Sequence, residues 1–272
     1  MSSKLPDISV LGLGIRCPEQ VTYETEERIR ACREVLYVDT GVASGAYLQT
    51  LNDRVTPMFG DSYGEEVSRL GTYRTIATRV VHAAMERGPV AFAVQGHPTV
   101  FVNPPFIMRD MADLLGLSME VLPGVSSMAA LLAELQIDPG VHGILMYEAT
   151  DMMMRVRPLL ADVPTLIWQP GAAESRLYTR RRNRPERLRR LQAYLMRFYP
   201  ASHPVTALFV SPHPLVKSVR LDLTVGALVE HASDLHVGVT LYLPPHRIRP
   251  VWDVEMQHRL DDADYLRSVT ED

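Results

Sequence analysis

The sequence has only two cysteines, no long hydrophobic run and no excess of basic residues. Cys17 and Cys32 cannot supply a disulfide framework, and without a metal-like spacing of Cys and His they favour a reducing compartment and predict no metal site. The opening MSSKLPDISV lacks the pattern of a signal peptide, and no apolar run approaches the roughly 18 residues that span a bilayer. These absences predict a cytoplasmic protein with no membrane partner.

The composition provides enough apolar material for a large core. The 272 residues, 46% of them hydrophobic, suffice for one large domain or two ordinary ones. A formal net charge of -4 argues against a nucleic-acid partner, although a local basic patch is compatible with that balance.

Strand-like and helix-like segments alternate through the first half of the chain. We expect strands at 8–15, 34–40, 89–96 and 119–123, and helices at 25–35, 67–84 and 106–117. Residues 41–62 are rich in Gly, Ser, Asn, Asp and Pro, so we expect them to be irregular. The alternation predicts a mostly parallel sheet.

The second half continues the alternation. We expect a helix at 128–135, an amphipathic segment at 184–200, and strands at 143–149, 164–171, 204–211 and 236–244. Two α/β halves joined near residue 124 fit this pattern better than one continuous sheet. We therefore predict an N-terminal α/β domain over 5–122, a C-terminal α/β domain over 126–246 and a tail over 247–272.

The stretch FAVQGHPTVF, residues 92–101, ends a buried strand in a sharp turn. Pro98 cannot donate to a sheet ladder, and Gly96 allows backbone angles that other residues avoid. Ligands bind at such strand ends in open parallel sheets, although a simple connecting loop is the more frequent outcome. His97 has no visible carboxylate partner, so ordering the loop is its more ordinary role.

Two further patterns each allow a functional and an ordinary interpretation. Gly12 and Gly14 resemble part of a dinucleotide fingerprint, but Cys17 stands where the third glycine belongs, and Asp39 is more often a turn or cap residue than a ribose ligand. An arginine-rich segment at 176–190 is usually a solvated face. It would also suit an acidic peptide or a carboxylate-rich substrate, because an arginine fork binds carboxylates bidentately. Its arginines are Arg176, Arg180, Arg181, Arg182, Arg184, Arg187, Arg189 and Arg190.

Three motifs, VLGLGI, AVQGHPTVF and LPGVSS, in this order and spacing, resemble the tetrapyrrole methylase family. The resemblance implies a two-domain α/β fold that binds S-adenosylmethionine in the cleft between the domains. It assigns donor contacts to residues at predicted strand ends. These are Gly96, His97, Val100, Phe101, Ser126, Ser127, Gln169, Thr240, Leu241 and Pro244.

A closer resemblance lies within that family. GHPTVFVNP, LPGVS, ELQIDPG, YEATD, LIWQ and TLYLPP are similar to segments of borosin-type peptide backbone α-N-methyltransferases. The resemblance implies a peptide substrate, and it assigns catalysis to Tyr63, Arg69 and Tyr73, which have the family's spacing of six and then four residues. It also implies a homodimer. Because fused borosins carry their substrate on a long C-terminal extension and this chain ends about 28 residues after Pro244, we expect the precursor peptide to come from a separate chain.

Residues of these types suit methylation of an amide. The amide nitrogen is a poor nucleophile because resonance draws its electron pair into the bond to carbon. A tyrosine is a feasible base only where a cation favours phenolate, and Arg69 and Tyr73 share a helix face because they are four residues apart. Taken alone, Tyr73 on its apolar stripe would read as a core residue.

Three other functions are considered. Methylation of a tetrapyrrole or another small molecule would leave Tyr63 and Arg69 without a special role. A dehydrogenase would use Gly12, Gly14 and Asp39. A degenerate module that binds a peptide without transferring a methyl group is suggested by Gln95 in place of an aromatic residue and by the lack of an acidic residue after PGVSS.

Overall fold

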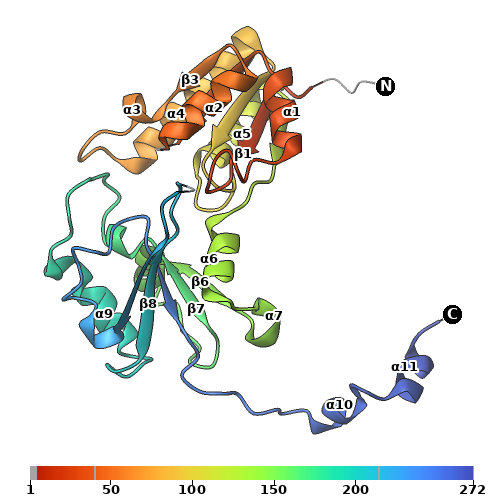
Figure 1. Cartoon of the computed structure of the whole chain (residues 1–272), viewed down its shortest axis with the longest axis vertical. Coiled ribbons are helices and arrows are strands. Elements are labelled where there is room, and N and C mark those ends of the chain that lie inside the picture. The colour runs from red at the N-terminus through yellow and green to blue at the C-terminus, as the bar shows by residue number, and fades with distance from the viewer. Residues whose placement is uncertain (1–4, 40, 214, 272) are drawn as a thin grey trace.

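The computed structural model describes residues 5–39, 41–213 and 215–271. Each of two lobes contains its own five-stranded sheet, and the lobes lie one above the other along the long axis of the molecule (Figure 1). The chain passes between them after residue 122, and the tail extends away from the second lobe.

The sheet of the first lobe is entirely parallel, as predicted. Its order is β3 (Val55–Pro57), β2 (Glu34–Val38), β4 (Val90–Val94), β1 (Ile8–Gly12) and β5 (Met119–Leu122). The central strands β1 and β4 are buried along their whole length, because helices cover both faces of the sheet.

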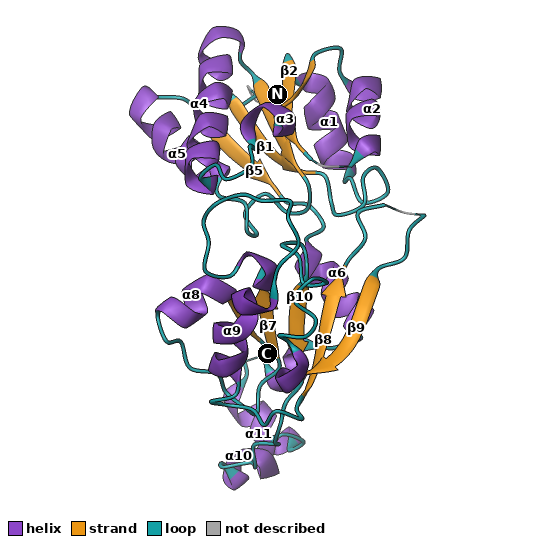
Figure 2. Ribbon diagram, turned by 90° about the vertical axis from the view of Figure 1, so that its left-hand side faces the viewer, coloured by secondary structure: helices purple, strands orange, loops and turns teal. Residues whose placement is uncertain are grey.

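The helices divide between the two faces of this sheet (Figure 2). The first-lobe helices are α1 (Tyr23–Ala31), α2 (Val42–Leu51), α3 (Phe59–Ser62), α4 (Arg69–Arg87) and α5 (Pro104–Leu115). Ile76 of α4 and Met108 of α5 pack with Phe92 on one face, whereas Ile29 of α1 and Leu48 of α2 pack with residues on the other. The strands therefore contribute side chains to two separate hydrophobic cores, one on each face of the sheet.

The expectation that residues 41–62 are irregular is wrong. They contain α2, β3 and α3. Leu48 is fully buried, and the pairing of β3 with β2 gives Val55 a place in the sheet. Tertiary packing thus overrides the weak helix and strand preferences of a segment rich in small and polar residues.

The sheet of the second lobe differs from the predicted parallel arrangement. Its order is β6 (Leu145–Glu148), β7 (Thr165–Trp168), β10 (Thr240–Leu243), β8 (Pro204–Phe209) and β9 (Val219–Thr224). Only β6 and β7 are parallel, and the other neighbours are antiparallel. β9 has no counterpart among the predicted strands.

Short helices connect these strands. The predicted amphipathic segment at 184–200 forms the 3-10 turn η2 and the short helix α9, and it still buries Leu188, Leu191 and Leu195. The helical segments of this lobe are α6 (Ser127–Leu135), α7 (Pro139–His142), α8 (Ala149–Met154), η1 (Pro170–Ala172), η2 (Pro185–Leu188), α9 (Arg189–Leu195) and η3 (Val225–Ala227).

The tail carries two short helices, α10 (Val254–Arg259) and α11 (Ala263–Val269). Both lie away from the lobes (Figure 1), and every described residue from His246 onward is exposed. None of the helices in the described ranges is both long and apolar enough to cross a membrane.

Three glycines meet where the lobes join. A Cβ on Gly12 would lie 2.6 Å from the carbonyl oxygen of Gly96 and 2.7 Å from the Cα of Gly124. These distances leave no space for any side chain, so Gly12, the last residue of β1, allows the close approach of the backbones. Asp39 accepts a hydrogen bond from the Gly41 N–H (2.8 Å) and contacts Ser44, which is the behaviour of a turn residue.

We expect Gly12→Ala to lower the free energy of unfolding by about 1–3 kcal/mol, because the added methyl group overpacks the backbone junction. Gly60→Ala is the matched control, because no atom lies within 4 Å of a Cβ at this helical position. Urea unfolding of both variants measures the difference. Equal stability of the two variants would contradict the proposed close approach.

Candidate active site

A cavity of about 440 Å³ lies between the lobes. We call it the interlobe cavity. Gln95 and Phe101 of the first lobe face Trp168 of β7 and Thr240 of β10 across it. The rings of Phe101 and Trp168 lie 4.8 Å apart, so an aromatic contact joins the lobes at the cavity wall.

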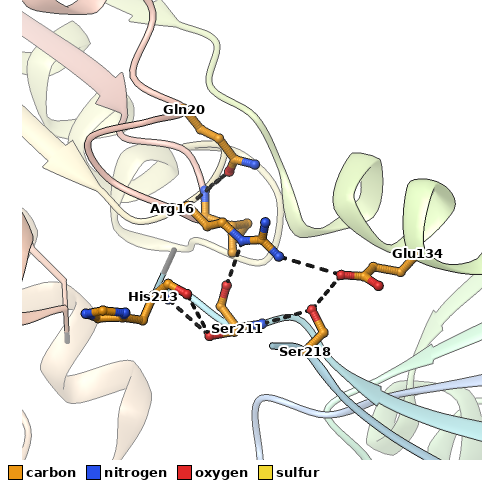
Figure 3. Close-up of polar contacts among 7 residues, drawn as sticks. Arg16, Gln20, Glu134, Ser211, His213 and Ser218 are labelled. Atoms are coloured by element: carbon orange, nitrogen blue, oxygen red, sulfur yellow. Dashed lines mark hydrogen bonds and ion pairs between the residues drawn. The ribbon is translucent and has the colours of Figure 1, made fainter. Parts of the chain in front are cut away.

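Polar contacts also hold the lobes together beside this cavity (Figure 3). Arg16 follows β1 and donates a hydrogen bond to the carbonyl of Ser211 (3.3 Å), and its guanidinium lies 3.6 Å from Glu134 of α6. Ser218 donates to the same carboxylate (2.6 Å). Because Ile15 lines the cavity next to Arg16, these contacts fix one side of its wall.

Five of the predicted donor contacts line the interlobe cavity. They are Val100, Phe101, Ser127, Gln169 and Thr240. Three others are absent from the lining but lie close to lining residues in the sequence. Gly96 has a φ of 77° and donates its N–H to the carbonyl of Gly14 (2.7 Å), and Ser126 caps α6 by accepting from the Ala129 N–H (3.2 Å). His97 accepts from the Thr99 N–H (3.2 Å), so it orders the loop.

Leu241 and Pro244 lie outside the cavity lining. Leu241 is fully buried in the core on the other face of β10. Pro244 follows the opposite end of β10, where its carbonyl lies 3.0 Å from Nε2 of His203. Side chains alternate between the two faces of β10, and the strand runs away from the cavity. Of the three predicted residues on or after β10, Thr240 is therefore the one that lines the cavity.

The predicted catalytic residues come together next to this cavity. Tyr63 and Tyr73 line a smaller space of about 190 Å³, the tyrosine cavity, which shares Phe101 with the interlobe cavity. Tyr73 also lines a space of about 410 Å³ with Arg69, the Arg69 cavity, which shares Gln169 with the interlobe cavity. Tyr73 therefore stands between two spaces that both adjoin the interlobe cavity.

Neutral groups hold the guanidinium of Arg69. Its Nη1 donates to the side-chain oxygen of Gln169 (3.1 Å), and its Nη2 donates to the carbonyl of Ser175 (2.7 Å). Arg69 forms no ion pair with a described residue, so its charge remains available to a ligand.

A segment of the second lobe, the strap (residues 175–178), pairs with the start of α4. The Arg69 N–H donates to the carbonyl of Arg176 (2.9 Å), and the Tyr178 N–H donates to the carbonyl of Val67 (2.9 Å). The ring of Tyr178 meets that of Tyr63 edge-on with centroids 5.3 Å apart. The strap thus positions two of the three catalytic candidates, Arg69 and Tyr63, across the lobe boundary.

Burial is the largest influence on the pKa values of the two tyrosines at this site. It raises the pKa of Tyr73, and the nearby Arg69 opposes that rise only in part. Burial also raises the pKa of Tyr63, which Tyr73 and Tyr178 raise further against the opposing effect of Arg69. Arg69 does favour phenolate, as expected, but burial outweighs its effect, so in the free protein both phenols keep their protons near neutral pH.

Sequence reasoning missed three polar residues at this site. Glu148 and Thr150 line the Arg69 cavity, and each has one buried oxygen without a hydrogen-bond partner among the described residues. The indole N–H of Trp168, at the interlobe cavity, is also buried without a described partner. Buried polar atoms of this kind are normally satisfied by water or a ligand. Their only sequence signal was membership of the YEATD and LIWQ motifs.

A family model for tetrapyrrole (corrin/porphyrin) methylases matches residues 7–208, which contain all three predicted catalytic residues. The chain belongs to this methylase family. The family prediction made from the three glycine-containing motifs is therefore confirmed, and the dehydrogenase alternative loses its support. The match includes lining residues of the interlobe cavity from both lobes, such as Gln95 and Trp168.

Curated relatives of this methylase carry the words methyltransferase and cyclic peptide precursor in one name. The chain is 29% identical over 261 residues to the omphalotin A methyltransferase/precursor of Omphalotus olearius, with 95% of this chain and 62% of the relative covered. It is 30% identical over 169 residues to a type II borosin methyltransferase/precursor of Phlebiopsis gigantea, with 62% and 30% covered. The predicted similarity to borosins is confirmed, although the chain spans less than two thirds of the length of either relative.

Solved methyltransferases share the fold. The methyltransferase CobJ matches with a TM-score of 0.64 and 17% identity over 90% of this chain and 96% of that one. Uroporphyrin-III C-methyltransferase of Thermus thermophilus, complexed with S-adenosyl homocysteine, matches with a TM-score of 0.59 and 16% identity over 87% and 91%. These likenesses confirm the predicted fold.

We expect Tyr178→Ala to lower the free energy of unfolding by about 2 kcal/mol, because it removes the ring that packs on Tyr63 at the lobe boundary. Tyr178→Phe keeps that ring and should cost less than about 1 kcal/mol, since the hydroxyl's hydrogen-bond partner among the described residues is the exposed Arg180. Thermal unfolding compares the variants. A loss of similar size in both would assign the effect to the hydroxyl.

Proposed function

We propose that the chain is an S-adenosylmethionine-dependent methyltransferase that α-N-methylates backbone amides of a ribosomally made precursor peptide. The observation that carries the proposal is the grouping of Tyr63, Arg69 and Tyr73 around spaces that adjoin the interlobe cavity. The names of the relatives, which join a methyltransferase to a peptide precursor, support the same substrate class.

The residues of the interlobe cavity fit a nucleoside-containing methyl donor. Its volume of about 440 Å³ lies within the range of small-molecule sites. Apolar and aromatic side chains suit an adenine ring, and the buried Trp168 N–H and the side chain of Gln169 offer polar groups. S-adenosylmethionine, when bound there, supplies an electrophilic methyl group.

The chain's own residues act on the amide. As the amide nitrogen loses its proton, negative charge moves onto the carbonyl oxygen, and the guanidinium of Arg69 stabilises that charge. Tyr73 accepts the proton as phenolate, because Arg69 is the main charge acting on it. Tyr63, whose pKa is raised further, keeps its proton and donates a hydrogen bond.

Glu148 and Thr150 supply acceptors for the remaining peptide N–H groups. Each presents a buried oxygen without a described partner in the cavity that holds Arg69 and Tyr73. A peptide backbone offers N–H donors at regular intervals, so these oxygens would orient it.

The assembly and the source of the peptide stay predictions. We propose a homodimer, supported by exposed apolar side chains on the tail such as Trp252 (97% exposed) and Leu260 (73% exposed). We also propose that the precursor is supplied as a separate chain.

The donor site is tested by Phe101→Ala, which removes a ring that lines the interlobe cavity. We expect the Kd for S-adenosylhomocysteine to rise roughly tenfold, equivalent to about 1.4 kcal/mol of lost contact. Phe106→Ala is the matched control, because Phe106 is similarly exposed (40% against 46%) and lies outside the cavity lining. Calorimetry that finds equal affinities for the two variants would exclude this donor site.

The base is tested by the pH dependence of methyl transfer to a precursor peptide. Because burial raises the pKa of Tyr73, its phenolate is a small fraction near neutral pH, and this fraction grows about tenfold per pH unit below that pKa. The rate should therefore climb about tenfold per unit between roughly pH 7 and 9. Tyr73→Phe should lower the rate about 10²- to 10³-fold and abolish this dependence.

Tyr63→Phe is the control for this profile. It should lower the rate but keep the slope, because the pKa of Tyr63 lies further above neutrality and its phenol acts as a donor. A flat profile in the unmodified protein, or an unchanged slope in Tyr73→Phe, would refute the assignment of Tyr73 as base.

A further inference from the structure

A wide depression of about 760 Å³ lies beside the strap. We call it the arginine groove, because Arg181, Arg182, Arg184 and Arg187 line it. Ser175 lines both this groove and the Arg69 cavity, so the two spaces adjoin. The arginine-rich segment is therefore next to the amide-handling residues.

Only some of the positive charge of this segment is neutralised within the chain. Arg181 pairs with Glu66 (2.9 Å) and Glu65 (3.4 Å). In contrast, neither Arg182 nor Arg184 forms an ion pair within the described ranges. Two exposed guanidinium groups thus face the groove without a carboxylate partner.

Other pairings lie at the edge of the groove. Arg189 pairs with Glu186 (3.1 Å), and Arg190 lies 3.7 Å from Glu174. Both are exposed contacts of little energetic value, which a stronger anionic ligand can replace.

A half-buried cation adds to the unbalanced charge. Arg187 donates to the carbonyl of Ala173 (3.1 Å), a neutral partner. Burial and the nearby charge of Arg69 lower its pKa, and Glu174 opposes that effect only in part. An anion bound between the strap and Arg187 would offset the repulsion between Arg187 and Arg69. It would also compensate the Arg187 guanidinium for the hydration lost on burial.

We propose that the arginine groove binds acidic side chains of the substrate peptide, on residues that flank the amide held beside Arg69 and Tyr73. This inference rests on the proposed peptide methylation. Each arginine fork can pair with a separate carboxylate, and such pairs are short and directional. The groove thus selects a peptide with acidic residues near its methylated segment.

Discrete carboxylates fit the groove better than a continuous phosphate backbone. Glu66, Glu174 and Glu186 also line it and would repel the fixed charges of a phosphate backbone, whereas flexible glutamate side chains can turn away from these carboxylates and toward Arg182 and Arg184. The strap that borders the groove also holds Arg69 through the carbonyl of Ser175. A peptide anchored there is therefore held close to the site of methylation.

The test measures binding of a fluorescent hexaglutamate peptide to the full chain by anisotropy. The unmodified protein should bind it at low salt, roughly 20 mM, and more weakly near 300 mM, because salt screens exposed charges. Arg182→Glu with Arg184→Glu should weaken binding at least about tenfold. Arg54→Glu with Arg109→Glu makes the same charge change at two exposed positions outside the groove and should leave binding within about twofold.

Several results would overturn the proposal. They are no binding of hexaglutamate, equal losses in the groove and control variants, or tighter binding of an oligothymidylate that the groove variant abolishes. The assay needs no methyl transfer. A protein that binds hexaglutamate in the groove but methylates no peptide would therefore refute the proposed function alone.

Discussion

Backbone hydrogen bonds between residues 66–69 of the first lobe and 176–178 of the second determine the geometry of the candidate active site. They fix the start of α4, and Arg69 is the first residue of that helix. The same strap directs the carbonyl of Ser175 to the guanidinium and the ring of Tyr178 to Tyr63. The site therefore exists only when both lobes are folded and docked.

In the proposed mechanism, the balance between burial and charge assigns different roles to Tyr63 and Tyr73. Burial raises the pKa of both phenols, but the neighbours of Tyr63 add to the rise and the neighbour of Tyr73 opposes it. We propose that Arg69 thereby serves two purposes, favouring the phenolate of Tyr73 and stabilising charge on the substrate amide. Because Arg69 is bound by a side-chain amide and a carbonyl, its positive charge is not cancelled by a carboxylate.

Local sequence patterns predicted the elements that are deeply buried, because burial requires a recognisable run or periodicity of apolar residues. The strands β1 and β4 and the long helix α4 follow from uninterrupted or periodic apolar residues. The elements within 41–62, the antiparallel direction of most second-lobe strands and the strand β9 depended on partners distant in sequence, so the local pattern was insufficient to predict them. β9, for example, is specified mainly by its pairing with β8.

The same distinction applies to the site. The spacing of Tyr63, Arg69 and Tyr73 was enough for the family resemblance to select them, whereas Leu241 and Pro244 required the direction and facing of β10 to be known. The contacts of the strap and of Tyr178 join the two lobes, and the unpartnered oxygens of Glu148 and Thr150 belong to residues that line a cavity formed by both lobes. No periodicity within one segment encodes such contacts.

The most direct test of peptide N-methylation uses S-adenosylmethionine with a deuterated methyl group and a precursor peptide encoded beside this chain. Tandem mass spectrometry of the peptide locates the transferred group. The account predicts deuterated methyl groups on backbone amide nitrogens. Label confined to side chains, or transfer to a tetrapyrrole with none to the peptide, would contradict it.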